Sequence, residues 1–168
     1  MIRRSTELDI EAIARQHYDA VYRFCARRVG VDRAADVSQE TFLTAQKVLH
    51  KFRGESSLIT WLFGIANNEC RRASRRSMLD PMLLDIDPDV PASGNSETSI
   101  VDRHALSEAL GKLSNEHREV VVLHELEGLT YEEAAHVLQI PVGTVKSRLH
   151  HAFQQMRRTL FQTEEAKR

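Results

Sequence analysis

The side chains best suited to bind a ligand lie near the C-terminal end of the chain, between Pro141 and Leu160. On a helical wheel of about 100° per residue, one face of this segment carries short polar, basic and imidazole groups. These are Lys146, Ser147, His150, His151, Gln154 and Arg158. No acidic residue occurs from Ala134 to Thr163, so the surface has one sign of charge. Such groups hydrogen-bond base edges and neutralise phosphates, which indicates a nucleic-acid-binding face.

A second group of candidate ligand-binding residues is a run of four arginines in six positions, Arg71, Arg72, Arg75 and Arg76. The run ends an apolar helical pattern. Because cations are favoured at any helix C-terminus, a solvated helix end is one interpretation. A strip that binds phosphates is the other, and the presence of another basic face in the same chain favours it.

The chain offers few residues for catalysis or metal binding. Cys25 and Cys70 are lone cysteines on apolar helical patterns, which is typical of small buried core residues. None of the eight histidines belongs to an HExxH motif or lies beside a CxxC pair. We therefore expect no enzymatic activity, no small-molecule substrate, no cofactor and no bound metal.

The basic face near the C-terminus must be positioned by a pair of helices. Thr130 and Glu133 have the spacing of a capping box, which predicts a helix that begins at about Tyr131. Pro141 ends that helix and suits the start of the next. The stripe expected to pack the second helix comprises Val145, Leu149, Ala152, Phe153, Met156 and Leu160. This pattern is a helix–turn–helix, whose second helix enters a DNA major groove. An ordinary helical hairpin with a solvated basic face is the alternative.

The remaining periodicity is also helical, and no strand pattern is present. Asp9 is expected to cap a first helix that ends at Gly30, and Asp32 to cap the next. Ser56 or Ser57 and then Ser114 cap two more. Helices are expected over residues 10–29, 33–51, 58–76, 101–113 and 115–127, followed by the helix–turn–helix. The fold class is therefore all-α, with two small helical domains, the C-terminal one containing four helices.

A flexible acidic linker is expected between the two domains, which span residues 1–76 and 101–168. Residues 77–100 contain three prolines, five acidic residues and no apolar period. Such a segment extends to about 80 Å. The formal net charge of −1 conceals this segregation, since residues 1–78 carry a surplus of basic side chains. The chain has no run of eighteen apolar residues and no apolar signal core, so we expect a cytoplasmic protein.

The helix expected over 33–51 is apolar on more than one face. Val37, Thr41, Ala45 and Val48 form one stripe, and Phe42, Leu43 and Leu49 fall outside it. Such a helix buries more than one face, either within its own domain or against a partner.

Three stretches, in this order, resemble the extracytoplasmic-function (ECF) sigma factors. These are the smallest sigma subunits of bacterial RNA polymerase, and they keep only regions 2 and 4. The stretches are Asp36-Val37-Ser38-Gln39-Glu40-Thr41-Phe42, residues 52–76 around Thr60-Trp61-Leu62, and residues 113–160 around Gly128-Leu129-Thr130-Tyr131-Glu132-Glu133 and Val142-Gly143-Thr144-Val145-Lys146-Ser147-Arg148-Leu149.

The resemblance implies a transcription initiation factor that binds core RNA polymerase and promoter DNA and is held inactive by an anti-sigma factor. Region 2 would occupy residues 1–76 and region 4 residues 101–168. The implied core-polymerase-binding residues are Asp36, Gln39, Glu40, Phe42 and Leu43. The implied −10 residues, with Asn67 and Asn68 as base readers, are Arg53, Ser57, Trp61, Asn67, Asn68, Arg71, Arg72, Arg75 and Arg76. The implied −35 residues are Thr144, Lys146, Ser147, Arg148, His150, His151 and Arg157.

Two other classes of protein remain as alternatives. A free-standing transcriptional regulator shares the helix–turn–helix but does not require the Asp36 helix or the Trp61 to Arg76 segment. A nuclease requires a carboxylate or His/Cys metal cluster, which the sequence does not supply.

Overall fold

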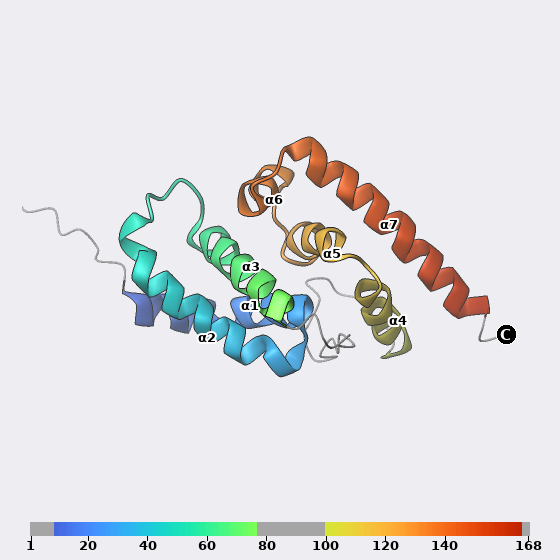
Figure 1. Ribbon diagram of the computed structural model, residues 1–168, viewed down its shortest axis with the longest axis horizontal. Coiled ribbons are helices and arrows are strands. Elements are labelled where there is room, and N and C mark those ends of the chain that lie inside the picture. The colour runs from blue at the N-terminus through green and yellow to red at the C-terminus, as the bar shows by residue number, and fades with distance from the viewer. Residues whose placement is uncertain (1–8, 77–99, 166–168) are drawn as a thin grey trace, which may run out of the picture.

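The computed structural model describes residues 9–76 and 100–165, and every regular element in these ranges is helical (Figure 1). Four elements form an N-terminal bundle: α1 (Ile10–Val29), α2 (Val31–Val48), the 3-10 turn η1 (Leu49–Lys51) and α3 (Leu58–Arg76). Five form a C-terminal bundle: α4 (Ile100–Gly111), α5 (Asn115–Val121), the π-turn η2 (Val122–Leu126), α6 (Tyr131–Leu138) and α7 (Val142–Glu165). The predicted all-α fold is confirmed. The predicted linker lies outside the described residues, except for Ile100, which begins α4.

The N-terminal bundle packs α1, α2 and α3 against one another. The Asp9 carboxylate accepts a hydrogen bond from the Glu11 amide at 3.1 Å and caps α1, as predicted. The rings of Phe24 and Phe63 stack in the core with their centroids 5.0 Å apart. Cys25 and Cys70 are free and buried, which confirms that they are core residues.

One prediction about α2 is wrong, and for Phe42 the structure decides between the two alternatives left open. Asp32 does not cap the helix, because α2 already begins at Val31. Gly30, at φ 86°, allows the chain to turn from α1 into α2 without an intervening loop. Phe42 does not present an open apolar surface, because its ring is buried and lies 6.0 Å from that of Tyr18. At least one of the apolar side chains outside the main stripe of α2 is therefore buried within its own bundle.

The C-terminal bundle begins its helices with the predicted caps. Ser114 Oγ accepts from the His117 amide at 3.3 Å. The Thr130 hydroxyl accepts from the Glu133 amide at 3.1 Å, and the Glu133 carboxylate accepts from the Thr130 amide at 2.9 Å. This reciprocal pair is the predicted capping box. Gln139, in the left-handed conformation at φ 56°, ends α6.

The π-turn η2 and the position of Phe153 were not predicted. In η2 the Glu127 amide donates to the Val122 carbonyl at 2.9 Å, which inserts one extra residue into the helical register. Phe153 is 44% exposed, although the wheel placed it on the packing stripe of α7. The bundle buries the stripe of Val145, Leu149, Ala152 and Met156, and Leu160 packs against it half-buried.

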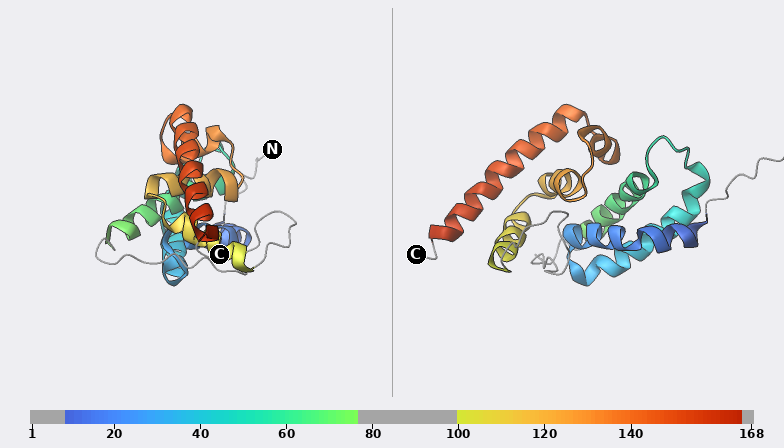
Figure 2. Two further views of the ribbon diagram at one scale, coloured as in Figure 1. Left: turned by 90° about the vertical axis from the view of Figure 1, so that its right-hand side faces the viewer. Right: turned by 180° about the vertical axis from the view of Figure 1, so that it is seen from behind.

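The two bundles lie against each other through α3 and α6. Figures 1 and 2 show α2 along one outer edge of the molecule and α7 along the opposite edge, with α3, α5 and α6 between them. None of the helices in the described ranges combines the length and apolar character needed to cross a membrane.

Arg118 joins α5 to the end of α4, and its removal should destabilise the C-terminal bundle. Its guanidinium donates to the carbonyls of Leu110, Gly111 and Leu113 at 3.0, 2.9 and 2.9 Å. Burial lowers the pKa of Arg118 to about 10, so the group remains charged at neutral pH. We expect Arg118→Met to lower the free energy of unfolding by about 2–3 kcal/mol, because charged hydrogen bonds to helix-terminal carbonyls are lost.

Urea denaturation followed by circular dichroism measures this change. Lys112→Met is the matched control, since the exposed pair of Lys112 with Glu108 stabilises by at most about 0.5 kcal/mol. Equal effects of the two substitutions would contradict the role of Arg118.

Candidate nucleic-acid and protein interfaces

The first candidate surface is the outer face of α7, which follows α6 through a tight turn. The Pro141 carbonyl accepts from the amides of Thr144 and Val145 at 2.9 and 3.2 Å and starts α7. Val145 and Leu149 are buried and fix the rotation of the helix. The predicted Lys146, Ser147, His150 and His151 therefore lie together on the exposed side.

Lys146 is positioned by a residue that the sequence did not indicate. Its Nζ lies 5.1 Å from the centroid of the Tyr131 ring, at the start of α6. That ring stacks on His124, with centroids 4.3 Å apart, and His124 Nδ1 lies 2.6 Å from the Leu129 carbonyl oxygen. Tyr131 therefore holds the ammonium group through a cation–π contact across the turn. Fifteen positions separate the two residues, so no local pattern reveals the contact.

Other polar groups on α7 already have partners within the chain. His150 Nε2 lies 2.9 Å from Gln154 Nε2, and the rings of His150 and His151 are 5.6 Å apart. The Ser147 hydroxyl donates to the carbonyl of the half-buried Thr144 at 3.1 Å. Arg148 lies 3.6 Å from the Glu116 carboxylate. Arg157 lies further along the helix, and its side chain is exposed.

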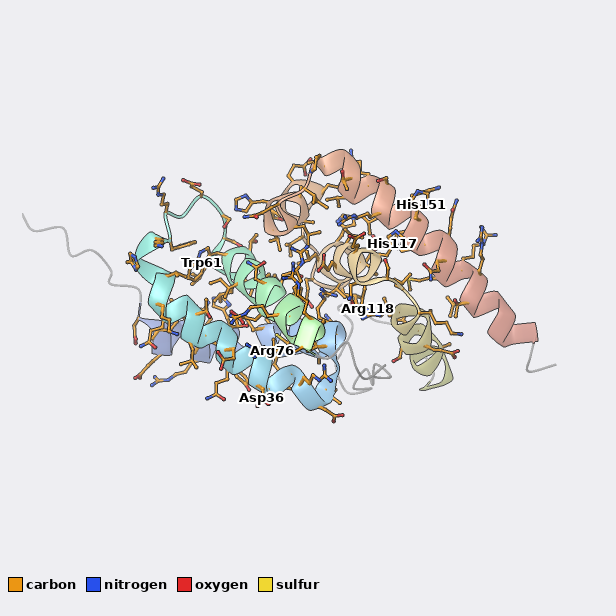
Figure 3. All side chains as sticks on the ribbon, viewed as in Figure 1. Asp36, Trp61, Arg76, His117, Arg118 and His151 are labelled. Atoms are coloured by element: carbon orange, nitrogen blue, oxygen red, sulfur yellow. The ribbon has the colours of Figure 1, made fainter. Side chains whose placement is uncertain are left out.

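The second candidate surface is the loop before α3 together with the start of that helix. Ser57 Oγ accepts from the Thr60 amide at 3.1 Å and caps α3. Trp61 packs on Phe52, with ring centroids 5.2 Å apart, and is labelled at the start of α3 in Figure 3. A cavity of about 260 Å³ opens beside them, lined by Lys51, Phe52, Arg53, Glu55, Ser56, Trp61 and His136. His136 belongs to α6, so this cavity lies between the two bundles.

The arginine run is divided between exposed and paired side chains. Arg75 and Arg76 are exposed at the end of α3. Arg72 pairs with Glu69 of its own helix at 3.1 Å. Arg71 donates from Nε and Nη2 to the Glu119 carboxylate of α5 at 2.8 Å each. The guanidinium of Arg71 is therefore occupied by the other bundle.

The predicted base reader Asn67 does not face solvent in this arrangement. Its side chain is completely buried, and neither the amide nitrogen nor the amide oxygen has a hydrogen-bond partner. Its neighbour Asn68 is exposed. A helical wheel predicts the position of Asn67 on α3, but not that the side chain is buried.

The third candidate surface is the acidic edge of α2. Asp36, Gln39 and Glu40 are exposed, and Leu43 is 42% exposed beside them. The edge borders an open cavity of about 570 Å³ whose other wall includes Arg72 and Arg76 of α3. An apolar side chain beside carboxylates suits a protein partner. In the part of the chain that the structure describes, no three His, Cys, Asp or Glu side chains are arranged to hold a metal ion.

Comparison with known proteins identifies the two bundles. Residues 13–78 match the family described as Sigma-70 region 2, and residues 103–156 match Sigma-70, region 4. The chain is 31% identical over 168 residues to the RNA polymerase sigma factor YlaC of Bacillus subtilis, covering 95% of this chain and 96% of that protein. The chain belongs to the ECF sigma factors of the sigma-70 family.

Other sigma factors support the same assignment. The chain is 35% identical over 130 residues to the ECF RNA polymerase sigma-E factor of Escherichia coli K12, covering 70% of this chain and 68% of that protein. This protein is therefore a transcription initiation factor rather than a free-standing regulator.

Two solved structures share the fold at 24% sequence identity. One is a sigma factor RpoE from Bartonella quintana in complex with the anti-sigma factor NepR, with a TM-score of 0.73 over 90% of this chain and 96% of that one. The other is CnrH in complex with the cytosolic domain of CnrY, with a TM-score of 0.65 over 90% and 86%.

The cation–π contact gives a prediction that does not depend on DNA. In this sigma factor the Tyr131 ring should shift the Lys146 Cε proton resonances upfield. Tyr131→Phe should retain this shift and Tyr131→Leu should remove it, because only an aromatic face attracts the ammonium group. At an exposed site this attraction amounts to about 0.5–1 kcal/mol. NMR of selectively labelled lysines measures both variants. Random-coil Lys146 shifts in the wild-type protein would contradict the contact.

Proposed function

We propose that this sigma factor divides promoter recognition between its two bundles. Residues 1–76 would bind core RNA polymerase and the −10 element, residues 101–168 the −35 element, and residues 77–100 would connect them. The observation that carries the proposal is the position of the exposed acidic edge of α2 and the exposed basic face of α7 on opposite edges of the molecule, marked by Asp36 and His151 in Figure 3. A polymerase bound on one edge leaves the other edge free for DNA.

The docking surface for core polymerase is the exposed part of α2. Asp36, Gln39 and Glu40 supply polar and charged contacts, and Leu43 supplies the apolar one. Phe42 supports this surface from below, because its ring is packed under it against Tyr18. The arrangement fits a basic, partly apolar partner helix.

The −10 element would bind at the loop and first turns of α3. Arg53, Ser57 and Trp61 surround or border the cavity of about 260 Å³, which suits a base extruded from single-stranded DNA. Asn68 and the arginines of α3 would contact the bases and phosphates beyond it.

The −35 element would bind the outer face of α7 in the major groove. Lys146, Ser147, His150 and His151 would contact base edges, with Tyr131 aiming Lys146. Thr144, Arg148 and Arg157 would lie against the flanking phosphates.

We further propose that the protein has no catalytic activity of its own, acts in the cytoplasm on core polymerase and promoter DNA, and is inhibited by an anti-sigma factor. One of the solved structures described above is a complex of a sigma factor with an anti-sigma factor, which supports such a partner here.

In vitro transcription tests the function directly. Promoters are first selected from a randomised library with the reconstituted holoenzyme. Transcription from these promoters is then measured with sigma-free core polymerase, in the presence and in the absence of this protein. Specific transcripts should require it. Equal initiation by core polymerase alone would overturn the proposal.

Glu40→Lys should weaken the binding of core polymerase at least about tenfold while leaving the fold intact, because it reverses an exposed charge on the docking edge. Titration of labelled protein with core polymerase measures the Kd. Asp19→Lys makes the same charge change on the exposed side of α1 and serves as the control. If the two variants bind alike, α2 is not the docking surface.

Lys146→Ala should weaken the binding of the holoenzyme to promoters that contain the selected −35 element by about 1–3 kcal/mol. It should have little effect on binding to promoters without that element. Competition binding on matched promoter pairs gives this difference. Lys112→Ala removes an exposed lysine just after α4 and should leave the difference unchanged. An equal loss on both kinds of promoter would show that Lys146 contacts only phosphates.

A further inference from the structure

Gln154 lies on the outer face of α7 and contacts the imidazole ring of His150. Both side chains are exposed, and Nε2 of the Gln154 amide lies 2.9 Å from His150 Nε2. At about 100° per residue, four positions bring Gln154 to within about 40° of His150, one turn further along the helix. Gln154 therefore extends by one turn the face that Lys146 and His150 form.

The contact between the two side chains determines which polar atoms of the amide remain available. An amide nitrogen donates and does not accept, so a hydrogen bond between the two nitrogens requires a ring nitrogen with a free lone pair. His150 Nε2 is then the acceptor, and the ring proton is on Nδ1. The amide donates one of its two N–H groups in this bond. Its oxygen Oε1 and its other N–H therefore remain available to a ligand.

The His150 ring is itself held by neighbouring imidazoles. The His151 ring meets it edge-on, with centroids 5.6 Å apart. The His117 ring of α5 lies 6.3 Å from that of His151, and both residues are labelled in Figure 3. These contacts restrict the rotation of the His150 ring, so that its acceptor nitrogen stays directed toward the next turn of α7.

The position of Gln154 along α7 places it opposite a different base pair from Lys146. The eight steps from Lys146 to Gln154 rise about 12 Å along the helix axis, which corresponds to about three or four base pairs of a duplex. The face carries no acidic residue before Glu164 that could bind the amide in place of DNA. The amide of Gln154 is therefore available to a base edge when α7 lies in a major groove.

We infer that Gln154 is a specificity-determining residue that selects adenine in the −35 element, and that His150 is the residue that positions its amide. The available Oε1 and N–H match the N6 donor and the N7 acceptor of adenine, which a glutamine binds through two hydrogen bonds. The inference rests on the proposed binding of the −35 element by α7. The side-chain pair itself exists without DNA and is tested separately.

Nitrogen-15 NMR of the full chain tests the pair in the absence of DNA. At about pH 8, where imidazole rings are neutral, His150 should carry its proton on Nδ1. Gln154→Leu should lower the fraction of this tautomer, because Nε2 no longer accepts a hydrogen bond. Gln16→Leu removes an exposed glutamine from α1 and should leave the His150 resonances unchanged. A proton on His150 Nε2 in the wild-type protein would overturn the inference, since the amide oxygen would then face the ring.

The base preference of the reconstituted holoenzyme tests the role of Gln154. Competition binding compares promoters that differ at one base pair of the selected −35 element. At one position the wild-type protein should prefer adenine about tenfold, and Gln154→Leu should remove this preference while retaining the one that depends on Lys146. Gln16→Leu should change neither. An unchanged preference in Gln154→Leu, or a preference for guanine at the affected position, would show that the amide does not read adenine.

A pH profile separates positioning by His150 from a merely structural role. Protonation converts the acceptor nitrogen into a donor, so the adenine preference of the wild-type protein should fall at least about threefold between about pH 8 and about pH 6. His150→Gln supplies an acceptor that does not titrate, and it should keep the preference at both pH values. His150→Phe keeps a ring without an acceptor and should lose the preference at both. A wild-type preference that is the same at both pH values would refute the positioning role.

Other titratable or charged groups surround His150, and they are the same in the wild-type protein and in His150→Gln. They are Lys146, His151 and Arg157 on α7, Arg148 with its partner Glu116 of α5, His117 of α5, and Tyr131 of α6 beside Lys146. A pH effect on the adenine preference that arises from these groups should therefore persist in His150→Gln. Only an effect that this substitution removes is assigned to His150.

The outcomes distinguish this inference from the proposed function. If Lys146→Ala changes the base preference and Gln154→Leu does not, α7 reads the −35 element without Gln154, and the inference alone fails. If the holoenzyme has no preference at any −35 position, the proposed function fails and the role of Gln154 fails with it, even where NMR shows the side-chain pair.

Discussion

The buried Glu119 carboxylate is surrounded by guanidinium groups of the other bundle. Arg28 and Arg71 together donate three hydrogen bonds to it, from two helices that are far apart in sequence. The same contact joins α1 and α3 of the N-terminal bundle to α5, and it occupies the guanidinium group of Arg71. The contact between the two bundles therefore depends largely on the buried Glu119 carboxylate.

The remaining architecture places the exposed surfaces around that contact. Because α3, α5 and α6 occupy the middle of the molecule, α2 and α7 remain at opposite edges (Figures 1 and 2). This packing leaves exposed the edge of α2 that we propose binds polymerase and the face of α7 that we propose binds the −35 element, but it buries Asn67 of α3.

Local structure was predictable from the sequence because its causes are local. Asp9, Ser114 and the Thr130/Glu133 box each act within three residues, and each cap was found where the sequence placed it. Packing across helices was less predictable. Phe42 and Phe153 have similar apolar side chains, yet one is buried and the other exposed, because the neighbouring helices cover different widths of α2 and α7.

The contacts that control the candidate site were not predictable from any pattern. Arg28 and Glu119 are separated by 91 positions, and Tyr131 meets Lys146 only because the chain reverses at Gln139. Helical wheels correctly placed Arg71 and Asn67 on α3, but a wheel of one helix contains no information about a second bundle. Glu119 and Glu127 lie on either side of η2, and their pairing with Arg28 and Arg27 is seen only when the two bundles are in contact.

The most direct test of this account is the distance between the bundles in the free protein and in its complex with core RNA polymerase. Spin labels attached at Gln16→Cys on α1 and Gln154→Cys on α7, both exposed positions, report this distance in both states. A single short distance is expected in the free chain and a substantially longer one in the complex, with the contacts of Arg28 and Arg71 to Glu119 broken. The same short distance in both states would contradict it, because promoter recognition would then proceed with the −10 face still covered.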